Sequence, residues 1–161
     1  MLFSYTTIRE SSAPADAKPV RIDGCLFGKP SPKDYRAIPQ LASPPRKVDL
    51  RPSCSPIEDQ GQLGSCTANA AIGALEYHQR KRGQPAVDLS RLFVYFNARR
   101  LGGRTNDDSG AEIAEAMAAL LAYGAPPEDR WPYDIGKFTQ EPAQALYEEA
   151  LKNQPAEYAR V

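Results

Sequence analysis

A glycine-punctuated loop runs directly into an alanine-rich segment between Asp59 and Ala70, and this stretch constrains the fold more than any other. Gly61 and Gly64 permit tight turns in the loop, and the alanines that follow favour a helix. Cys66 stands where the loop becomes helix. The first turn of a helix has unpaired N–H groups and partial positive charge, so a thiol there loses its proton more readily. The stretch therefore predicts a reactive cysteine at a helix start.

Gln60, six residues before this cysteine, supplies an uncharged amide donor. A donor held beside a nucleophile can stabilise the anionic oxygen of a tetrahedral acyl intermediate. The run Gln60-Gly61-x-x-Gly64-Ser65-Cys66 resembles the active-site segment of the papain/cathepsin family of cysteine peptidases. The resemblance implies that Cys66 is the nucleophile and that Gln60 is an oxyanion-hole donor. It also implies that Gly64 and Ser65 lie in the substrate-binding site.

Two positions depart from the usual pattern of this family. Leu63 stands where the family usually has a disulfide-forming cysteine, and Thr67 replaces the usual aromatic residue after the nucleophile. Both departures are typical of a bacterial subgroup with short N-terminal extensions. Upstream, residues 48–52 and 55–57 resemble the start of the mature enzymes.

Two other interpretations of Cys66 stay open. A cysteine before an alanine-rich helix is often a small buried residue without reactivity, although the spacing to Gln60 and the two glycines favours a peptidase. A cysteine-dependent acyl transferase would use the same nucleophile with an amine or thiol acceptor in place of water. No feature of the sequence favours that third interpretation.

Length and charge exclude several classes of protein. The 161 residues suffice for one modest domain. The 20 basic and 20 acidic side chains cancel, so no basic field would recruit nucleic acid or a membrane surface. The N-terminus lacks a basic region followed by an apolar run, so we expect no signal peptide, no membrane span and, by default, a cytoplasmic location.

The three cysteines are too few for a disulfide framework and lack the spacing of zinc ligands. A bridge between Cys25 and Cys54 is conceivable in an oxidising compartment, whereas free thiols are expected in the cytosol. We expect neither a metal nor a cofactor.

Residues 1–47 differ from the rest because they hold seven of the 15 prolines. Proline removes a donor and interrupts both regular structures, so this segment is expected to be extended and irregular. It is either a disordered leader or, as the resemblance implies, a propeptide-like strap across the cleft. Residues 48–161 would then be the mainly helical left-hand domain of the α+β papain-like fold.

Four helices are predicted in that domain from apolar periodicity and capping residues. The first spans about Ser65 to Arg82, and the second begins after Ser90 as N-cap and ends near Leu101. The third spans 111–123 and the fourth 139–153, with Pro142 in its first turn and Leu151 facing inward. Residues 156–161 resemble the start of a strand. These predictions follow from the sequence alone.

Ser109 and Gly110 correspond, by the resemblance, to a glycine-containing strip that pairs with the substrate backbone. A bare glycine can present its backbone to an extended peptide, as in strand addition. The preceding pair Asp107 and Asp108 could suggest a metal site, but capping of the third helix explains it better.

A general base is needed to accept the thiol proton, and the chain's single histidine is His78. It lies on the same predicted helix as Cys66, about 18 Å along the axis, which is too far. In the family the histidine and the asparagine lie in a second, right-hand domain. The chain is therefore interpreted as a peptidase fragment, inactive alone, that acts on peptide or protein substrates. Its expected partner is the missing right-hand domain or a second copy of itself. The alternative is a non-catalytic peptide-binding or assembly module.

Overall fold

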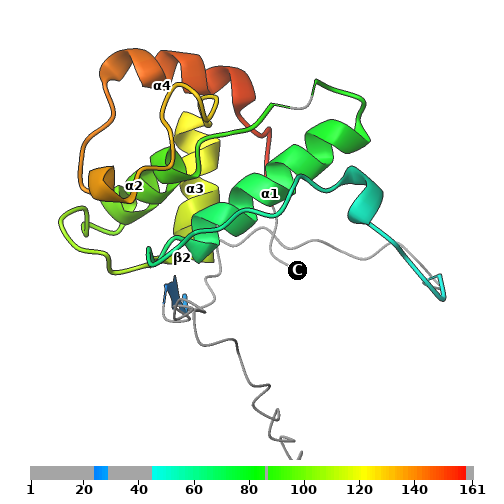
Figure 1. Ribbon diagram of the computed structural model, residues 1–161, viewed down its shortest axis with the longest axis horizontal. Coiled ribbons are helices and arrows are strands. Elements are labelled where there is room, and N and C mark those ends of the chain that lie inside the picture. The colour runs from blue at the N-terminus through cyan, green and yellow to red at the C-terminus, as the bar shows by residue number, and fades with distance from the viewer. Residues whose placement is uncertain (1–23, 29–44, 86, 159–161) are drawn as a thin grey trace, which may run out of the picture.

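The structure, a computed structural model, describes residues 24–28, 45–85 and 87–158 (Figure 1). Helices dominate the described part of the chain, and the two strands are very short. In chain order the elements are β1 (Cys25–Leu26), η1 (Arg51–Ser53), α1 (Cys66–Lys81), α2 (Arg91–Leu101), β2 (Ala111–Glu112), α3 (Ile113–Tyr123), η2 (Ile135–Lys137), α4 (Gln144–Ala150) and η3 (Leu151–Asn153).

Helices α1, α2 and α3 pack against one another and enclose the core (Figure 1). Every residue of α2 from Arg91 to Arg99 is buried, so this helix lies at the centre of the domain. Within the described residues, the apolar core consists of Leu63, Ala68, Ala71, Ile72, Leu89, Leu92, Phe93, Val94, Tyr95, Ala98, Ala111, Ala116, Ala119, Leu120, Ala125 and Ala150.

The first two helices begin and end as predicted. Ser65 is the N-cap residue of α1, and Gly83 follows that helix with a φ of 70°. This φ lies in the left-handed region that glycine adopts without strain. Ser90 caps α2 because its side chain accepts a hydrogen bond from the backbone N–H of Phe93.

The start of the third helix differs from the prediction. Helix α3 begins at Ile113 because Ala111 and Glu112 form β2 instead. Its N-cap is Glu112, which shares a capping box with Glu115. The prediction that the acidic pair before it caps this helix is therefore wrong, and Asp108 has another partner.

The fourth helix is shorter than predicted. It begins at Gln144, so Pro142 lies before the helix and not in its first turn. The chain then tightens into η3, and Leu151 is exposed, which corrects its expected inward position. Residues 156–158 form no strand, and residues 159–161 lie outside the described residues.

A loop over residues 126–134 is fixed to the start of α2. The backbone N–H of Ser90 donates to the Pro126 carbonyl at 2.9 Å, and the Ser90 hydroxyl donates to the Trp131 carbonyl at 2.6 Å. Leu89 and Pro127 form an antiparallel bridge beside them. The loop is therefore held rigidly over the centre of the domain.

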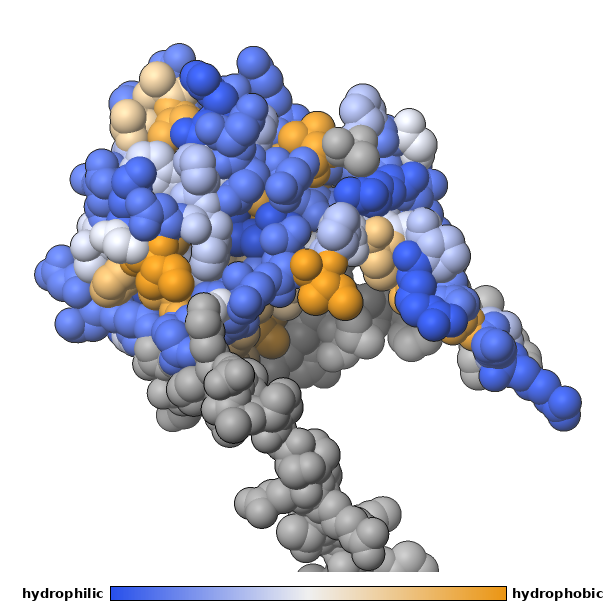
Figure 2. Space-filling view, in the orientation of Figure 1, coloured by the Kyte–Doolittle hydropathy of each residue, from blue (hydrophilic) through white to orange (hydrophobic). Residues whose placement is uncertain are grey.

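The exposed surface of the helical body is largely hydrophilic on the face shown in Figure 2. Residues 45–50 extend away from this body, and Val48 and Leu50 on that extension are exposed (Figure 1). Ile57 is fully exposed as well. Within the described ranges, no helix has the length and apolar character that a membrane span requires.

Candidate active site

The predicted position of Cys66 is confirmed, because it is the first residue of α1. Its side chain is half-buried, whereas Ser65 before it is fully buried. The Ser65 carbonyl accepts the backbone N–H of Asn69 at 3.0 Å, which closes the first helical turn around the cysteine. The thiol therefore lies at the positive end of the helix.

Gln60 is held at both its side chain and its backbone. The side-chain Nε2 donates to the Leu63 carbonyl at 2.9 Å, which uses one of the two N–H bonds of the amide. The Gln60 backbone carbonyl accepts the Tyr133 hydroxyl at 3.1 Å. We call residues 60–66 the nucleophile segment. The side chain of Gln60 is held within this segment by Leu63, and its backbone is held from outside it by Tyr133.

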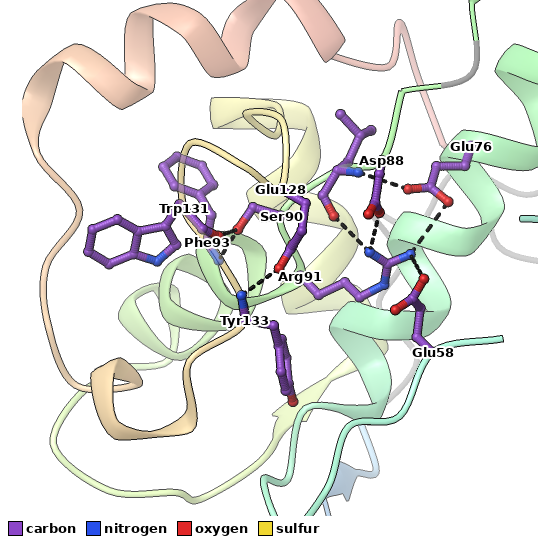
Figure 3. Close-up of polar contacts among 10 residues, drawn as sticks. Glu58, Glu76, Asp88, Ser90, Arg91, Phe93, Glu128, Trp131 and Tyr133 are labelled. Carbon is purple, nitrogen blue, oxygen red and sulfur yellow. Dashed lines mark hydrogen bonds and ion pairs between the residues drawn. The ribbon is translucent and has the colours of Figure 1, made fainter. Parts of the chain in front are cut away.

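Tyr133 reaches this segment from the 126–134 loop. Its hydroxyl lies 2.5 Å from the Ser65 Oγ, in addition to its bond to Gln60. Asn69 Nδ2 donates to the same Ser65 Oγ at 3.0 Å. Figure 3 shows the backbone N–H of Tyr133 bound to Glu128 while its ring points away from that carboxylate. Burial raises the pKa of Tyr133, so its hydroxyl keeps its proton and can donate.

Asp108 ties the nucleophile segment to the loop before β2. Its carboxylate accepts the backbone N–H of Gly64 at 3.0 Å and the Tyr95 hydroxyl at 2.5 Å. The Tyr95 hydroxyl accepts the N–H of Gly110 at 3.1 Å. Burial, followed by the bond to Asp108, raises the pKa of Tyr95. Two side chains therefore connect the backbones of Gly64 and Gly110.

Leu63, where the family usually has a disulfide-forming cysteine, is buried in the core. The backbone N–H of the next residue, Gly64, donates to both carboxylate oxygens of Asp108. None of the three cysteines, Cys25, Cys54 and Cys66, forms a disulfide.

A short piece of the N-terminal segment lies along β2. Strand β1 pairs with β2 in parallel, with Cys25 opposite Ala111. The Ala111 N–H donates to the Gly24 carbonyl at 3.1 Å. Gly24 also approaches Gly64 so closely that an added Cβ would stand 2.6 Å from the Gly64 backbone. An extended chain thus passes beside the nucleophile segment.

The N–H of Gly110 does not itself pair with the extended chain. Its own N–H points inward to Tyr95, and the N–H that pairs with the extended chain belongs to Ala111. The φ of Gly110 is 72°, and a Cβ there would collide with Gly24. Ser109 lies beside it, with its hydroxyl donating to the Gly110 carbonyl at 3.1 Å. A glycine at this position is therefore needed for the close approach.

His78 lies on α1 with Cys66, as predicted, and is twelve residues further along. At the helical rise this separates the two residues by about 18 Å. Among the described residues, no group of three His, Cys, Asp or Glu side chains could hold a metal ion.

A charge cluster around the buried side chains of Arg91 and Glu76 supports the start of α2 and was not found from the sequence. Arg91 contacts Glu76, Glu58 and Asp88, at 3.5, 3.2 and 2.8 Å (Figure 3). Beside it, burial raises the pKa of the Glu128 carboxyl to about 7. Sequence reasoning had no signal for the contacts with Glu58 and Glu76, because these residues lie 33 and 15 positions before Arg91.

Comparison with known proteins finds relatives among the cysteine peptidases. No family model matches the chain. A peptidase C1-like protein of Acanthamoeba polyphaga mimivirus is 37% identical over 164 residues, covering 99% of this chain and 46% of that protein. Cathepsin K of Gallus gallus is 30% identical over 109 residues, covering 65% of this chain and 31% of its own length. The chain thus spans less than half the length of these curated relatives.

Solved structures show the same relationship. Xylellain, a cysteine protease from Xylella fastidiosa, superposes with a TM-score of 0.76 at 32% identity, over 85% of this chain and 57% of that chain. Digestive procathepsin L 3 of Tenebrio molitor larval midgut shares the fold, with a TM-score of 0.55 at 21% identity over 74% of this chain and 38% of that one. The predicted papain-like fold is therefore confirmed, with the four helices corresponding to its helical left-hand domain. The chain belongs to the papain-like family of cysteine peptidases and is similar to its bacterial member xylellain.

Proposed function

We propose that this chain is the nucleophile-bearing part of a peptidase that cleaves peptide bonds through Cys66. The carrying observation is that Cys66 opens α1 while Gln60 is fixed in the same folded segment. The Cys66 thiolate attacks the peptide carbonyl, and Gln60 donates to the oxyanion. The C–N bond breaks, the amine leaves with a proton from the general base, and water hydrolyses the thioester.

The general base is proposed to come from a right-hand domain that these residues do not include. His78 is too far along α1 to accept the proton of Cys66. The greater length of the relatives supports a second domain. The exposed apolar side chains of Val48, Leu50 and Ile57 would fit against such a domain. Residues 48–161 would then be the left-hand domain, without turnover on their own.

The substrate is proposed to bind as an extended peptide along the edge of β2. At this edge Gly24 lies against the backbones of Gly64 and Gly110, and Ser65 and Ser109 are the sequence neighbours of these two glycines. Support comes from β1, because residues 24–28 already lie there as an extended chain with the Ala111 N–H as donor. The same pairing supports the proposal that residues 1–47 are a propeptide-like segment.

That pairing also favours a second candidate function. A domain that binds an extended segment beside β2, without chemistry at Cys66, would be a peptide-binding or assembly module. The two candidates differ in whether Cys66 reacts with an acylating peptide.

The test uses a dipeptidyl activated ester and a dipeptidyl fluorogenic amide. The 161-residue chain should be acylated once, at Cys66, and should not turn over the amide. Cys66→Ala should abolish acylation, whereas the control Cys54→Ala should not. An unreactive Cys66 would favour the binding module. Turnover by a monomer, confirmed by light scattering and abolished by Cys66→Ala, would refute the external base. Self-association would instead indicate that a second copy covers the exposed apolar side chains.

A further inference from the structure

The Tyr133 hydroxyl contacts Gln60, the proposed oxyanion donor, and Ser65, the residue before the proposed nucleophile. We infer that Tyr133 is a positioning residue, whose hydroxyl fixes the oxyanion donor Gln60 relative to the helix start that carries Cys66. This inference rests on the proposed function, because it assigns Tyr133 a role that acts through Gln60.

The inference stands on a continuous chain of hydrogen bonds. Asn69 Nδ2 lies 3.0 Å from the Ser65 Oγ, which lies 2.5 Å from the Tyr133 hydroxyl. The Tyr133 hydroxyl lies 3.1 Å from the Gln60 carbonyl oxygen. Ser65 immediately precedes Cys66, so the chain connects the helix start to the donor residue through a side chain 68 residues away in sequence.

Counting hydrogens fixes the direction of this chain. The Gln60 carbonyl can only accept, so Tyr133 must donate its single proton to it. The Ser65 hydroxyl must therefore donate to Tyr133, and its oxygen accepts from the Asn69 amide. Asn69 also hydrogen-bonds to the Tyr133 hydroxyl, and hydrogen bonds joined in this way strengthen one another.

Tyr133 is itself rigidly placed. Its backbone N–H donates to the Glu128 carboxylate, and the Glu128 N–H donates to the Asp88 carbonyl at 2.8 Å. The hydroxyl thus reaches Gln60 from a loop that is fixed to the start of α2. A fixed donor matters because oxyanion stabilisation depends on a group that is already in place when charge develops.

Gln60 is consequently held at two points. Tyr133 holds its backbone carbonyl, and the Leu63 carbonyl holds one N–H of its side chain. Replacing Tyr133 with phenylalanine keeps the ring packed against the core but removes the hydrogen bond to the Gln60 carbonyl. The Gln60 amide would then sample other positions, while the thiol at the start of α1 would keep its setting.

The test compares two reactions of the Cys66 thiol in a Cys25→Ser, Cys54→Ser background. Iodoacetamide reacts by displacement at carbon and forms no oxyanion, so its rate reports access and thiolate fraction. The dipeptidyl activated ester passes through an oxyanion. The ratio of acylation to alkylation rate constants therefore isolates the donor, and a purely structural change would move both rates together.

Gln60→Ala should lower this ratio about tenfold, less than the loss in a complete enzyme because the site is open to water. Tyr133→Phe should lower it about three- to tenfold by the same route. Ser65→Ala interrupts the same chain and provides a second variant if Tyr133→Phe unfolds, as judged by circular dichroism. The matched control is Tyr147→Phe, because the Tyr147 hydroxyl also has two partners, Asn97 at 3.0 Å and Arg100 at 3.4 Å.

The outcomes separate the inference from the function on which it rests. A lowered ratio for Tyr133→Phe and an unchanged ratio for Tyr147→Phe would support the positioning role. A ratio lowered by Gln60→Ala but not by Tyr133→Phe or Ser65→Ala would overturn the inference and leave the function intact. A ratio unaffected by Gln60→Ala would remove the oxyanion assignment and the inference together.

Discussion

Removal of the Asp108 carboxylate should loosen the nucleophile segment more than any other single surface-loop change. Asp108, which is half-buried, accepts hydrogen bonds from two buried residues, from the Gly64 N–H at 3.0 Å and from the Tyr95 hydroxyl at 2.5 Å. A buried donor left without a partner costs about 1–3 kcal/mol. With two donors affected, Asp108→Ala should lower the free energy of unfolding by about 3 kcal/mol. That is a large fraction of the about 5–15 kcal/mol typical of a domain.

The neighbouring substitutions make this magnitude testable. In Asp108→Asn the amide oxygen can accept both donors, so only the charge-assisted part is lost and the cost should be about 1 kcal/mol. Asp107→Ala is the matched control, because Asp107 is exposed and the hydrogen bond that it accepts from Arg99 is made by its backbone carbonyl, which alanine keeps. It should change the free energy of unfolding by less than about 0.5 kcal/mol.

Urea unfolding followed by circular dichroism measures all three variants at fixed protein concentration. The expected order of cost is Asp108→Ala, then Asp108→Asn, then Asp107→Ala. Equal destabilisation by the two alanine variants would refute the assignment of these hydrogen bonds. A cost of Asp108→Ala below that of Asp108→Asn would do so as well, since it would show that the two donors are easily rehydrated.

Three further outcomes are expected. Cys66 should be the cysteine that iodoacetamide labels fastest near pH 7, mapped by mass spectrometry, because it alone begins an α-helix. Gly110→Ala should displace residues 24–28 and speed their proteolysis, whereas Gly103→Ala, with a similar φ of 69° but no atom within 4 Å of the added Cβ, should not. In the folded state the pKa of Glu128 is about 7, above its ordinary value of 4.5. Between these two pH values the folded state binds the proton more tightly than the unfolded state does, so the free energy of unfolding falls as pH rises from 4.5 to 7. Glu128→Gln should therefore stabilise the protein by about 1 kcal/mol at pH 8, after allowance for solvent screening, and by almost nothing at pH 4.5.

Local sequence signals were sufficient for the elements that depend on local physics. The start of α1 at Cys66 and the N-cap at Ser90 follow from glycine placement and side-chain capping, which act within a few residues. The start of α3 was misjudged because Glu112, and not the acidic pair before it, forms the capping box with Glu115. Two competing caps lay within six residues, and periodicity alone does not choose between them.

The supports of the site could not be found in this way. Asp108 was interpreted as a helix cap, and nothing near Asp108 or Tyr133 in sequence indicates that they contact the nucleophile segment. Their partners Gly64 and Ser65 lie 44 and 68 residues away. Such pairs are set by tertiary packing, since the 126–134 loop and α2 must first be in place.

The arrangement of these supports bears on how the reactive cysteine is held. Gln60 and Ser65 are held by Tyr133, and Gly64 is held by Asp108, so three points of the nucleophile segment are bound to parts of the chain that follow α1. Both partners, Tyr133 and Asp108, lie within the described residues. The setting of the thiol is thus determined by the helical domain itself. If the proposed right-hand domain supplies the base, it needs to dock only one group against a nucleophile segment that is already fixed, which limits the ordering entropy of assembling the site.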